Sequence, residues 1–214
     1  MKKITDPALT LLLKEKESEY LDFKELLCNN NAQLVHDVLC LSNSKSLSDR
    51  YMIFGVADNK IIKGVSGQRK TQADIVDCLR NSNFNRMPDI LFYEVKHNDL
   101  TLDVLQIKNN PYKPYFLLKD KRDGKVTVRA GVVYTRNNDS NTPINSTASL
   151  DQIETMWREK FGLDENPLQR VMKYIHDIPH WKKVGAHEAF YQNFPEFKIV
   201  WSSESLDDDF YEHW

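Results

Sequence analysis

The sequence has little cysteine and no long apolar run. Only three of its 214 residues are cysteine, at Cys28, Cys40 and Cys78, and none of them forms a CxxC pair. Such usage is typical of reduced thiols, so we expect a cytoplasmic protein without a disulfide framework. No stretch reaches the roughly 18 apolar residues of a membrane span. The short apolar stretch at 8–13 is followed at once by charged residues, which argues against a signal peptide.

Several familiar motifs of enzymes are also missing. The chain contains no GxxxxGK[ST] phosphate loop, no GxGxxG dinucleotide motif and no GxSxG nucleophile elbow. His176 and His180 have the spacing of zinc ligands on a helix, but Pro179 lies between them and no further ligand stands at a familiar distance. We therefore expect no zinc site and no ATP-binding loop.

The charge of the chain is nearly balanced but unevenly distributed. Its formal net charge is −2, which excludes a strongly basic coat. Residues 1–150 contain 22 lysines and arginines against 18 acids, whereas residues 151–214 contain 7 against 13. This distribution favours an anionic partner that docks on the front part of the chain.

The hydrophobic pattern predicts an α+β fold, with a mixed β-sheet flanked by helices. Apolar residues at helical spacing predict helices over about 32–42 and from Thr71 onward, where Thr71 and Asp74 have the pattern of a helix start. Alternating or continuous apolar runs predict the strands. The expected strands cover 20–24, 51–56, a short piece near Ile61, 91–97, 100–107, 115–118, 125–129 and 132–136.

The polar segment 137–149 is the best linker candidate, which divides the chain into a core at 1–140 and an extension at 141–214. Ser149 and Gln152 have the spacing of a capping box, and Gly162 stands where that helix should end. Two further helices are expected, over about 167–176 and near 186–193. The extension should therefore be a small helical appendage, and its abrupt end at Trp214 suggests that more chain follows in the full-length protein.

The most chemically suggestive segment is the strand at 20–24. Successive side chains of a strand alternate between its faces, so Asp22 and Lys24 share one face while Leu21 and Phe23 share the other. Glu17 or Glu19 arrives from the preceding turn. Carboxylates beside a lysine can hold a divalent cation next to a phosphate, although ion pairs on a solvated strand face are the commoner explanation for such a segment taken alone.

Asp58 follows the buried strand at 51–56 and precedes a turn. A carboxylate at the end of a buried strand is well placed to bind a metal ion. It is equally common as a turn-forming residue, and the segment alone leaves both interpretations open.

Several ordered motifs together resemble the Schlafen AlbA_2 family. They are ESxxx[acid]FK at 17–24, Leu-Ser-Asn at 41–43, IFGVAD at 53–58, Ile-x-Gly-Val at 62–65, Arg-x-Gly-x-Val-Tyr-x-Arg at 129–136 and Asn-Thr at 141–142. The resemblance covers about residues 14–150. It implies a nucleic-acid-binding domain of mixed α/β fold, and in the nuclease members three acidic residues and a divalent cation cleave transfer or ribosomal RNA.

Carried over to this sequence, the resemblance implies catalytic and metal-binding roles for Glu17, Asp22 and Asp58, with Mg²⁺ or Mn²⁺ as cofactor. Lys24 would contact the scissile phosphate. Asp22 stands where glutamate is more usual, and Val56-Ala57-Asp58 stands where nuclease relatives tend to have two adjacent acids. The leading hypothesis is thus a metal-dependent endoribonuclease that acts on structured RNA such as transfer RNA.

Nucleic-acid contacts are expected from Lys24, Lys63, Arg129 and Arg136, because lysine and arginine neutralise backbone phosphates. For Arg129 and Arg136, ion pairs with acids on the sheet are an equally good interpretation. The alternative hypothesis is a non-catalytic DNA- or RNA-binding regulatory or sensor domain of a larger protein, such as a defence protein. A protein-interaction domain is a third interpretation. Because the motif set occurs once, a homodimer is expected if two domains are needed to form an RNA-binding cleft.

Overall fold

The computed structural model describes residues 2–67, 69–192 and 194–201. The chain forms two compact units, residues 1–161 and 162–214. In the part of the chain that the structure describes, no helix is both long enough and apolar enough to cross a membrane.

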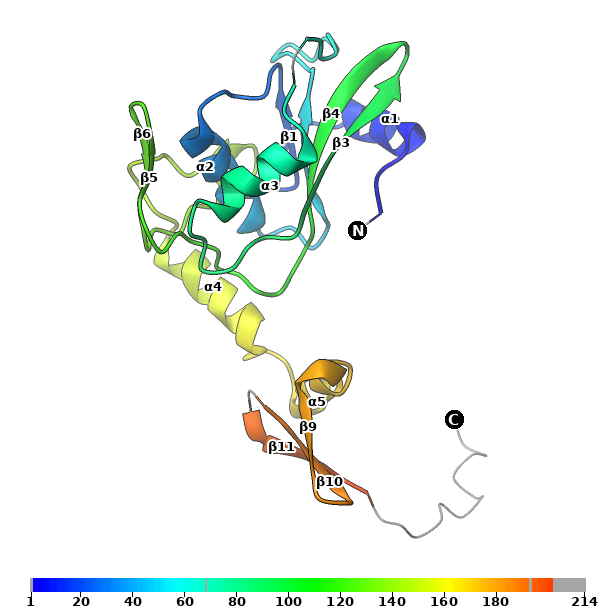
Figure 1. Cartoon of the computed structure of the whole chain (residues 1–214), viewed down its shortest axis with the longest axis vertical. Coiled ribbons are helices and arrows are strands. Elements are labelled where there is room, and N and C mark those ends of the chain that lie inside the picture. The colour runs from blue at the N-terminus through cyan, green and yellow to red at the C-terminus, as the bar shows by residue number, and fades with distance from the viewer. Residues whose placement is uncertain (1, 68, 193, 202–214) are drawn as a thin grey trace. The chain divides into compact units, whose positions relative to one another are not determined.

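A four-stranded mixed sheet is the centre of the first unit (Figure 1). Its strands are β1 (Leu21–Lys24), β2 (Arg50–Phe54), β3 (Ile90–His97) and β4 (Leu100–Ile107), in the order β1-β2-β4-β3. β1 runs parallel to β2, and the other neighbours are antiparallel. The α+β fold class predicted from the sequence is confirmed.

Helices cover both faces of this sheet. α1 (Asp6–Lys14) contributes Leu9 to a core that also contains Leu21 and Ile53. The opposite face, which includes Met52, packs against α2 (Asn31–Ser42) and α3 (Gln72–Arg80). Asp22 pairs with Met52 across β1 and β2. Because side chains alternate along a strand, the even positions of β1 face α2 and the odd positions face α1.

Two small hairpins and a helix complete the first unit. β5 (Lys121–Asp123) and β6 (Val126–Val128) form one hairpin, and β7 (Arg136–Asn137) and β8 (Ser140–Asn141) form the other. α4 (Leu150–Phe161) follows, and its start has the reciprocal Ser149–Gln152 hydrogen bonds of a capping box. Gly162 comes directly after α4 with a φ of +60°, a conformation that favours glycine.

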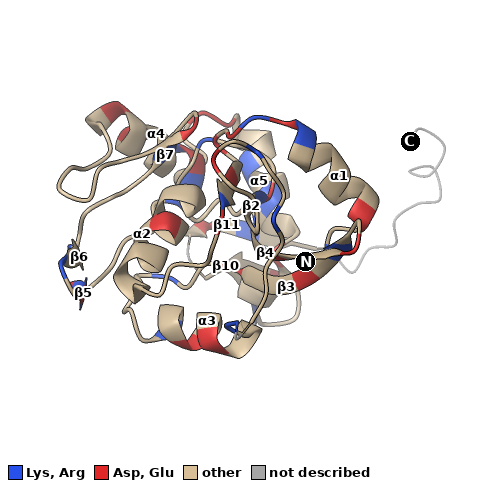
Figure 2. Ribbon diagram, turned by 90° about the horizontal axis from the view of Figure 1, so that it is seen from above, with Lys and Arg blue, Asp and Glu red and all other residues tan. Residues whose placement is uncertain are grey.

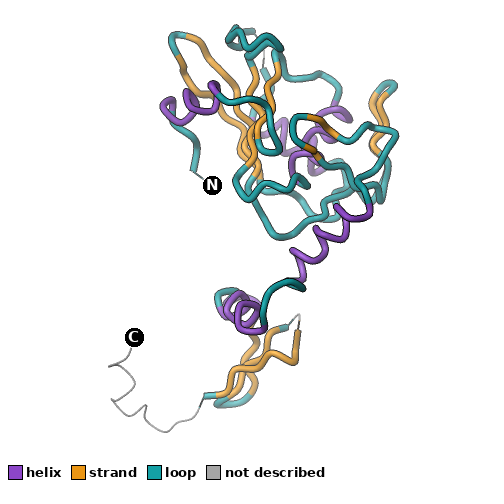
Figure 3. Tube along the Cα trace, turned by 180° about the vertical axis from the view of Figure 1, so that it is seen from behind, coloured by secondary structure: helices purple, strands orange, loops and turns teal. Residues whose placement is uncertain are grey.

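The second unit combines one α-helix with a three-stranded sheet (Figure 3). Its elements are α5 (Pro167–Ile175), a 3₁₀ turn at Ile178–His180, and the strands β9 (Trp181–Val184), β10 (Glu188–Tyr191) and β11 (Phe194–Val200), in the order β11-β10-β9. The ring of Tyr174 on α5 lies against Tyr191 and Phe194 of the sheet. Aromatic packing therefore joins the helix to the strands.

The structure corrects several expectations about local structure. The helix predicted near 186–193 is wrong, because that segment is mostly β10, and Gly185 with a φ of +69° turns the chain back from β9. The C-terminal part is thus not purely helical. The strands predicted at 115–118 and 132–136 are reduced to a bridge at Leu117 and the short β7. α1 was not predicted.

The boundary between the units also lies later than the expected end of the core at residue 140. Met156 and Ile153 of α4 pack against Val133 and Ala148 of the first unit. The expected linker at 137–149 is therefore part of that unit, with Thr142 and Ala148 buried. The end at Trp214, from which we expected further chain, lies outside the described residues.

Candidate functional site

Asp22 is the most deeply buried of the predicted acidic residues. Its neighbours Leu21 and Phe23 point into the core beneath α1, so Asp22 faces the α2 side, where it is only 2% exposed. Its Oδ2 atom lies 2.8 Å from Nζ of Lys24, and its Oδ1 atom lies 3.0 Å from Nη2 of Arg136. The sequence placed Asp22 beside Lys24, and the structure adds Arg136.

Arg136 is held by the protein on every side of its guanidinium group. Its Nε atom donates to the carbonyl of Ser18 over 2.7 Å, and its Nη1 atom donates to Oδ1 of Asn141 over 2.9 Å. Asn141 is opposite Arg136 in the β7–β8 hairpin, so the hairpin fixes both ends of this contact. With 2% of its side chain exposed, Arg136 is positioned to order the site, and it does not present its charge at the surface.

Glu17 comes from the turn before β1 and lies beside the same arginine. Its Oε1 atom accepts a hydrogen bond from the backbone N–H of Phe23 over 2.8 Å, and its Oε2 atom lies 3.9 Å from Nη2 of Arg136. Between Glu17 and Glu19, which the strand pattern left open, Glu17 is the one beside Asp22. We call Glu17, Asp22, Lys24 and Arg136 the Asp22 cluster.

Burial and pairing oppose each other in this cluster. Burial raises the pKa of Asp22 above its ordinary value, against the opposite effect of Lys24 and Arg136. For Lys24, burial acts to lower the pKa, but the attraction of Asp22 and its neighbouring acids outweighs it and raises the pKa. Lys24 therefore stays a cation. The Oδ2 atom of Asp22 and the Nη2 atom of Arg136 are buried, and neither has a partner in hydrogen-bond geometry. The contacts of Asp22 with Lys24 and Arg136 are therefore ion pairs that meet the distance criterion without being well-formed hydrogen bonds.

Residues that the sequence did not single out extend the cluster towards α2. Asp37 Oδ1 accepts hydrogen bonds from Nδ2 of Asn141 and Nε2 of Gln33, both over 3.0 Å. Gln33 and Asp37 are four residues apart in α2, so they share one face of the helix. That spacing was visible in the sequence, but only the fold shows that the face meets β8.

A pocket of about 280 Å³ opens beside this network. Its polar side chains include Lys24, Gln33, Asp37 and Asn141, and its remaining walls are largely apolar. The apolar walls come from Leu26, Leu27, Leu34, Met52 and Phe54, with Cys28 also lining the space. We call this space the Lys24 pocket. A few polar groups among apolar walls are the usual composition of a ligand site, and the volume of the pocket lies just below the usual range of about 300–1,000 Å³.

The other predicted site residues lie elsewhere. Asp58 is exposed in the turn after β2, and no polar contact among the described residues joins it to the Asp22 cluster. Lys63 is half-exposed and paired with Glu25 over 2.8 Å. Arg129 is exposed just after β6, apart from the buried Arg136, so the two arginines do not form one surface. The structure therefore unites Glu17, Asp22, Lys24 and Arg136 and leaves Asp58, Lys63 and Arg129 outside.

This arrangement does not fit a divalent metal ion as it stands. Each oxygen of Asp22 already faces a cation, Lys24 or Arg136, and one oxygen of Glu17 is used by a backbone N–H. A metal site needs several free oxygen ligands. Within residues 2–67, 69–192 and 194–201, no three or more histidine, cysteine, aspartate or glutamate side chains form a group that could hold a metal ion.

Comparison with known proteins identifies a family match that covers the site described above. The chain matches the family described as "Schlafen, AlbA_2" over residues 17–145, which contain the Asp22 cluster and the Lys24 pocket. No curated protein matches the chain. Among solved structures, the DIP2311 protein of Corynebacterium diphtheriae is similar over 82% of this chain and 34% of its own, with 12% identity and a TM-score of 0.41. This chain thus spans about a third of that protein's length. Because the family match covers more than half of its residues, the chain belongs to the Schlafen AlbA_2 family.

Proposed function

We propose that this domain binds nucleic acid at the Lys24 pocket. Membership of the Schlafen AlbA_2 family makes the chain a nucleic-acid-related domain. The observation that supports the proposal best is the position of Lys24, which lies on the strand β1 and lines a pocket of about 280 Å³.

Lys24 is suited to hold a backbone phosphate. Its side chain is 38% exposed, while its ion pair with Asp22 limits the orientations that Nζ can take. A lysine held in this way retains hydrogen-bond donors for a phosphate oxygen and loses less side-chain entropy on binding than a free surface lysine. Phosphate contacts of this kind fix the position of the nucleic acid on the protein.

The rest of the Lys24 pocket is suited to an unpaired base. Gln33, Asp37 and Asn141 offer amide and carboxylate groups at one side, and Met52 and Phe54 offer an apolar wall. Proteins that read single-stranded RNA combine hydrogen bonds to base edges with apolar or aromatic contacts to the ring. A loop or single strand of RNA therefore suits this pocket better than a continuous duplex.

The test compares Lys24→Ala with Lys96→Ala by fluorescence anisotropy, using labelled transfer RNA and single- and double-stranded DNA. Lys96 is an exposed lysine on β3 that donates to Thr101, so its substitution removes the same charge elsewhere. Losing one charge-assisted contact should weaken binding by Lys24→Ala about tenfold, whereas Lys96→Ala should bind like the parent. Equal binding by all three proteins would remove Lys24 from the proposal.

A second candidate function is metal-dependent cleavage of structured RNA with Mg²⁺ or Mn²⁺. The specific observation in its favour is that Glu17 and Asp22 both face Arg136 and that Asp22 also faces Lys24, so two of the three acids implied by the motif resemblance lie in one cluster. It requires Asp22 to exchange its present cationic partners, and Asp58 to approach from an exposed turn. It stays a prediction.

The two functions are separated by incubating the protein and its Asp22→Asn variant with transfer RNA in Mg²⁺, Mn²⁺ or EDTA. Fragments that appear only with metal and only with the parent protein would establish cleavage. Intact RNA that nevertheless shifts on a native gel in EDTA supports binding alone.

We also propose a homodimer, for which light scattering should give about twice the chain mass of 25.1 kDa.

A further inference from the structure

We propose that the β5–β6 hairpin is a second contact surface, which binds the phosphate backbone of nucleic acid away from the Lys24 pocket. This inference rests on the proposed nucleic-acid binding and assigns part of it to a particular element. The hairpin and its flanks carry five basic residues within eleven positions. They are Lys119, Lys121, Arg122, Lys125 and Arg129, and we call them the hairpin basic surface.

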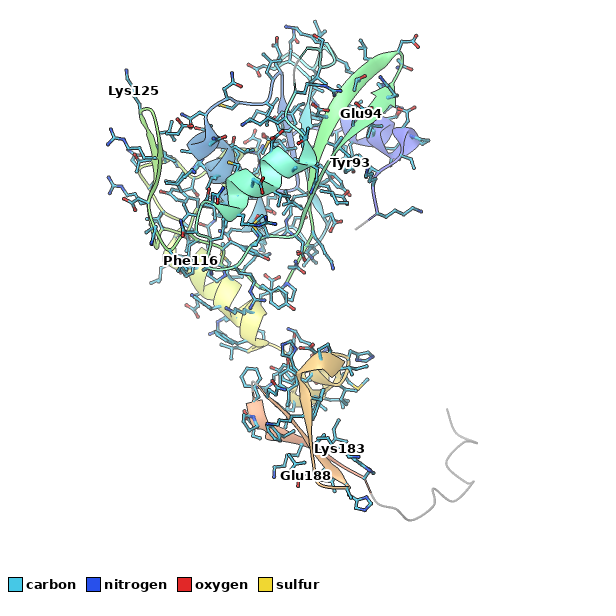
Figure 4. All side chains as sticks on the ribbon, in the orientation of Figure 1. Tyr93, Glu94, Phe116, Lys125, Lys183 and Glu188 are labelled. Carbon is cyan, nitrogen blue, oxygen red and sulfur yellow. The ribbon has the colours of Figure 1, made fainter. Side chains whose placement is uncertain are left out.

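Because side chains alternate between the two faces of a strand, some of these basic side chains lie on the outer face of the hairpin. In the register of the hairpin, Lys121 pairs with Val128, Arg122 with Thr127, and Asp123 with Val126. Val128 is fully buried, so its face of the hairpin packs on the domain, and Arg122 with Thr127 lies on the outer face. Lys125 occupies the turn and extends away from the body of the domain (Figure 4).

The two acids of the hairpin are used by the protein itself. Oδ2 of Asp123 accepts the backbone N–H of Asn31 at the start of α2 over 2.7 Å, and the Asp123 carbonyl accepts from Asn30. Oδ1 of Asp120 accepts the backbone N–H of Ala130 over 2.7 Å. Both carboxylates therefore stabilise local backbone, and neither neutralises a neighbouring lysine or arginine by direct contact.

The cations of the hairpin remain unpaired. Among the described residues, none of the five basic side chains forms an ion pair, and the one polar contact of Arg122 is with the carbonyl of Gly124 over 3.4 Å. Some exposed cations elsewhere on the domain are paired, as Arg69 is with Glu94 and Asp103 and as Lys63 is with Glu25. Figure 2 shows the blue segments of β5 and β6 at one edge of the first unit.

A polyanion with closely spaced charges is the partner that this surface fits. Unpaired lysines and arginines neutralise backbone phosphates and release their counterions, which gives affinity that falls steeply with salt. A projecting two-stranded ribbon is also a shape that can lie along a nucleic-acid groove or strand. The hairpin has no exposed aromatic or large apolar residue in its strands, so it is suited to the backbone and not to base stacking.

The test is a salt series of binding to labelled transfer RNA and duplex DNA by anisotropy. The main variant replaces Arg122, Lys125 and Arg129 with alanine, and the control replaces Lys2, Lys14 and Lys96, which removes the same charge from the N-terminal segment, α1 and β3. We expect the hairpin variant to bind about 10- to 100-fold more weakly at low salt, with a salt slope smaller by up to about three. The control should stay within about twofold of the parent.

Two further variants guard against misfolding. Arg122→Lys with Arg129→Lys keeps the charge and should retain parent affinity, and Lys125→Glu alters only the exposed turn and should weaken binding by itself. Circular dichroism would confirm that each variant is folded.

If the hairpin and control variants lose affinity equally, or if Lys125→Glu binds like the parent, the hairpin assignment is wrong while the binding function stands. A parent protein that binds no nucleic acid would instead overturn the proposed function.

Discussion

The Asp22 cluster and the hairpin basic surface use the same kinds of side chain in opposite ways. In the cluster, Arg136 is buried, fixed by three polar contacts and faced by carboxylates. On the hairpin, Arg122 and Lys125 are exposed, and the two acids of the hairpin and its flank, Asp123 and Asp120, accept backbone N–H groups. Charges of the first kind shape a site, whereas charges of the second kind attract a partner from solution.

If the hairpin binds nucleic acid as we propose, this difference explains how a nearly neutral chain binds a polyanion. Buried charges that face each other cancel locally, and screening by salt leaves their interaction almost unchanged. Exposed, unpaired cations act over a distance of about 8–10 Å at physiological salt and lose strength as salt is added. The location of the unpaired charges therefore predicts binding better than the net charge of −2 does.

The largest expected effect on stability comes from Arg136→Met. This change leaves Asp22 buried without its arginine partner and removes the donors to Ser18 and Asn141. Removing one partner of a buried pair typically costs about 3–5 kcal/mol. Urea unfolding should show a loss of that size for Arg136→Met, and a change below about 0.5 kcal/mol for the exposed Arg129→Met. Similar losses for both variants would contradict the contrast between buried and exposed arginines.

The next effect concerns the salt dependence of binding. Lys24→Ala removes the one phosphate contact that we propose for the pocket, so the slope of log affinity against log salt should change by about one. The triple hairpin variant should change it by up to about three. Measuring both slopes with the same transfer RNA ranks the two regions directly. A larger change for Lys24→Ala would place the main phosphate contacts in the pocket and contradict the assignment to the hairpin.

A smaller effect is expected from pH. Burial raises the pKa of Asp22, so the carboxyl group keeps its proton to higher pH in the folded state than in the unfolded chain, where aspartate has a pKa of about 3.9. The stability contributed by that proton is complete below about pH 3.9 and is lost as pH rises through the pKa of the folded state. The Asp22→Asn variant has no titrating carboxyl group at this position and so lacks this pH-dependent contribution to stability.

The unfolding free energy of the parent, minus that of Asp22→Asn, should therefore fall as pH rises from about 3.9. Urea unfolding at several pH values measures this difference. Asp103, whose pKa burial also raises, is present in both proteins and cancels. A difference that grows with pH would show that the ion pairs with Lys24 and Arg136 outweigh the cost of burying Asp22.

Sequence patterns predicted what depends on local spacing. Alternation placed Asp22 and Lys24 on one face, and the Thr71 and Ser149 capping boxes are present with both of their hydrogen bonds. The helix predicted at 186–193 failed because its aromatic residues serve a sheet that Gly185 turns back on itself. Spacing alone could not separate these alternatives, since short apolar runs suit both structures.

What the sequence could not give is the set of contacts that join distant segments. Arg136 donates a hydrogen bond to the carbonyl of Ser18, which is 118 positions away in the sequence. Asp123 accepts a hydrogen bond from the backbone N–H of Asn31, which is 92 positions away. Burial of Arg136 and use of Asp123 by α2 are products of the fold. They place Arg136 among acidic residues, which was one of the two roles that the sequence left open, and they leave the hairpin cations without acidic partners.

Titration of labelled transfer RNA with the parent protein in EDTA, at two salt concentrations, tests the central claim most directly. The claim is that exposed cations of a Schlafen AlbA_2 domain bind nucleic acid without needing a metal ion. We predict saturable binding that weakens about tenfold or more between roughly 50 and 200 mM salt, with the RNA intact on a denaturing gel. Absence of binding in EDTA that is restored by Mg²⁺ or Mn²⁺, or affinity that salt leaves unchanged, would contradict it.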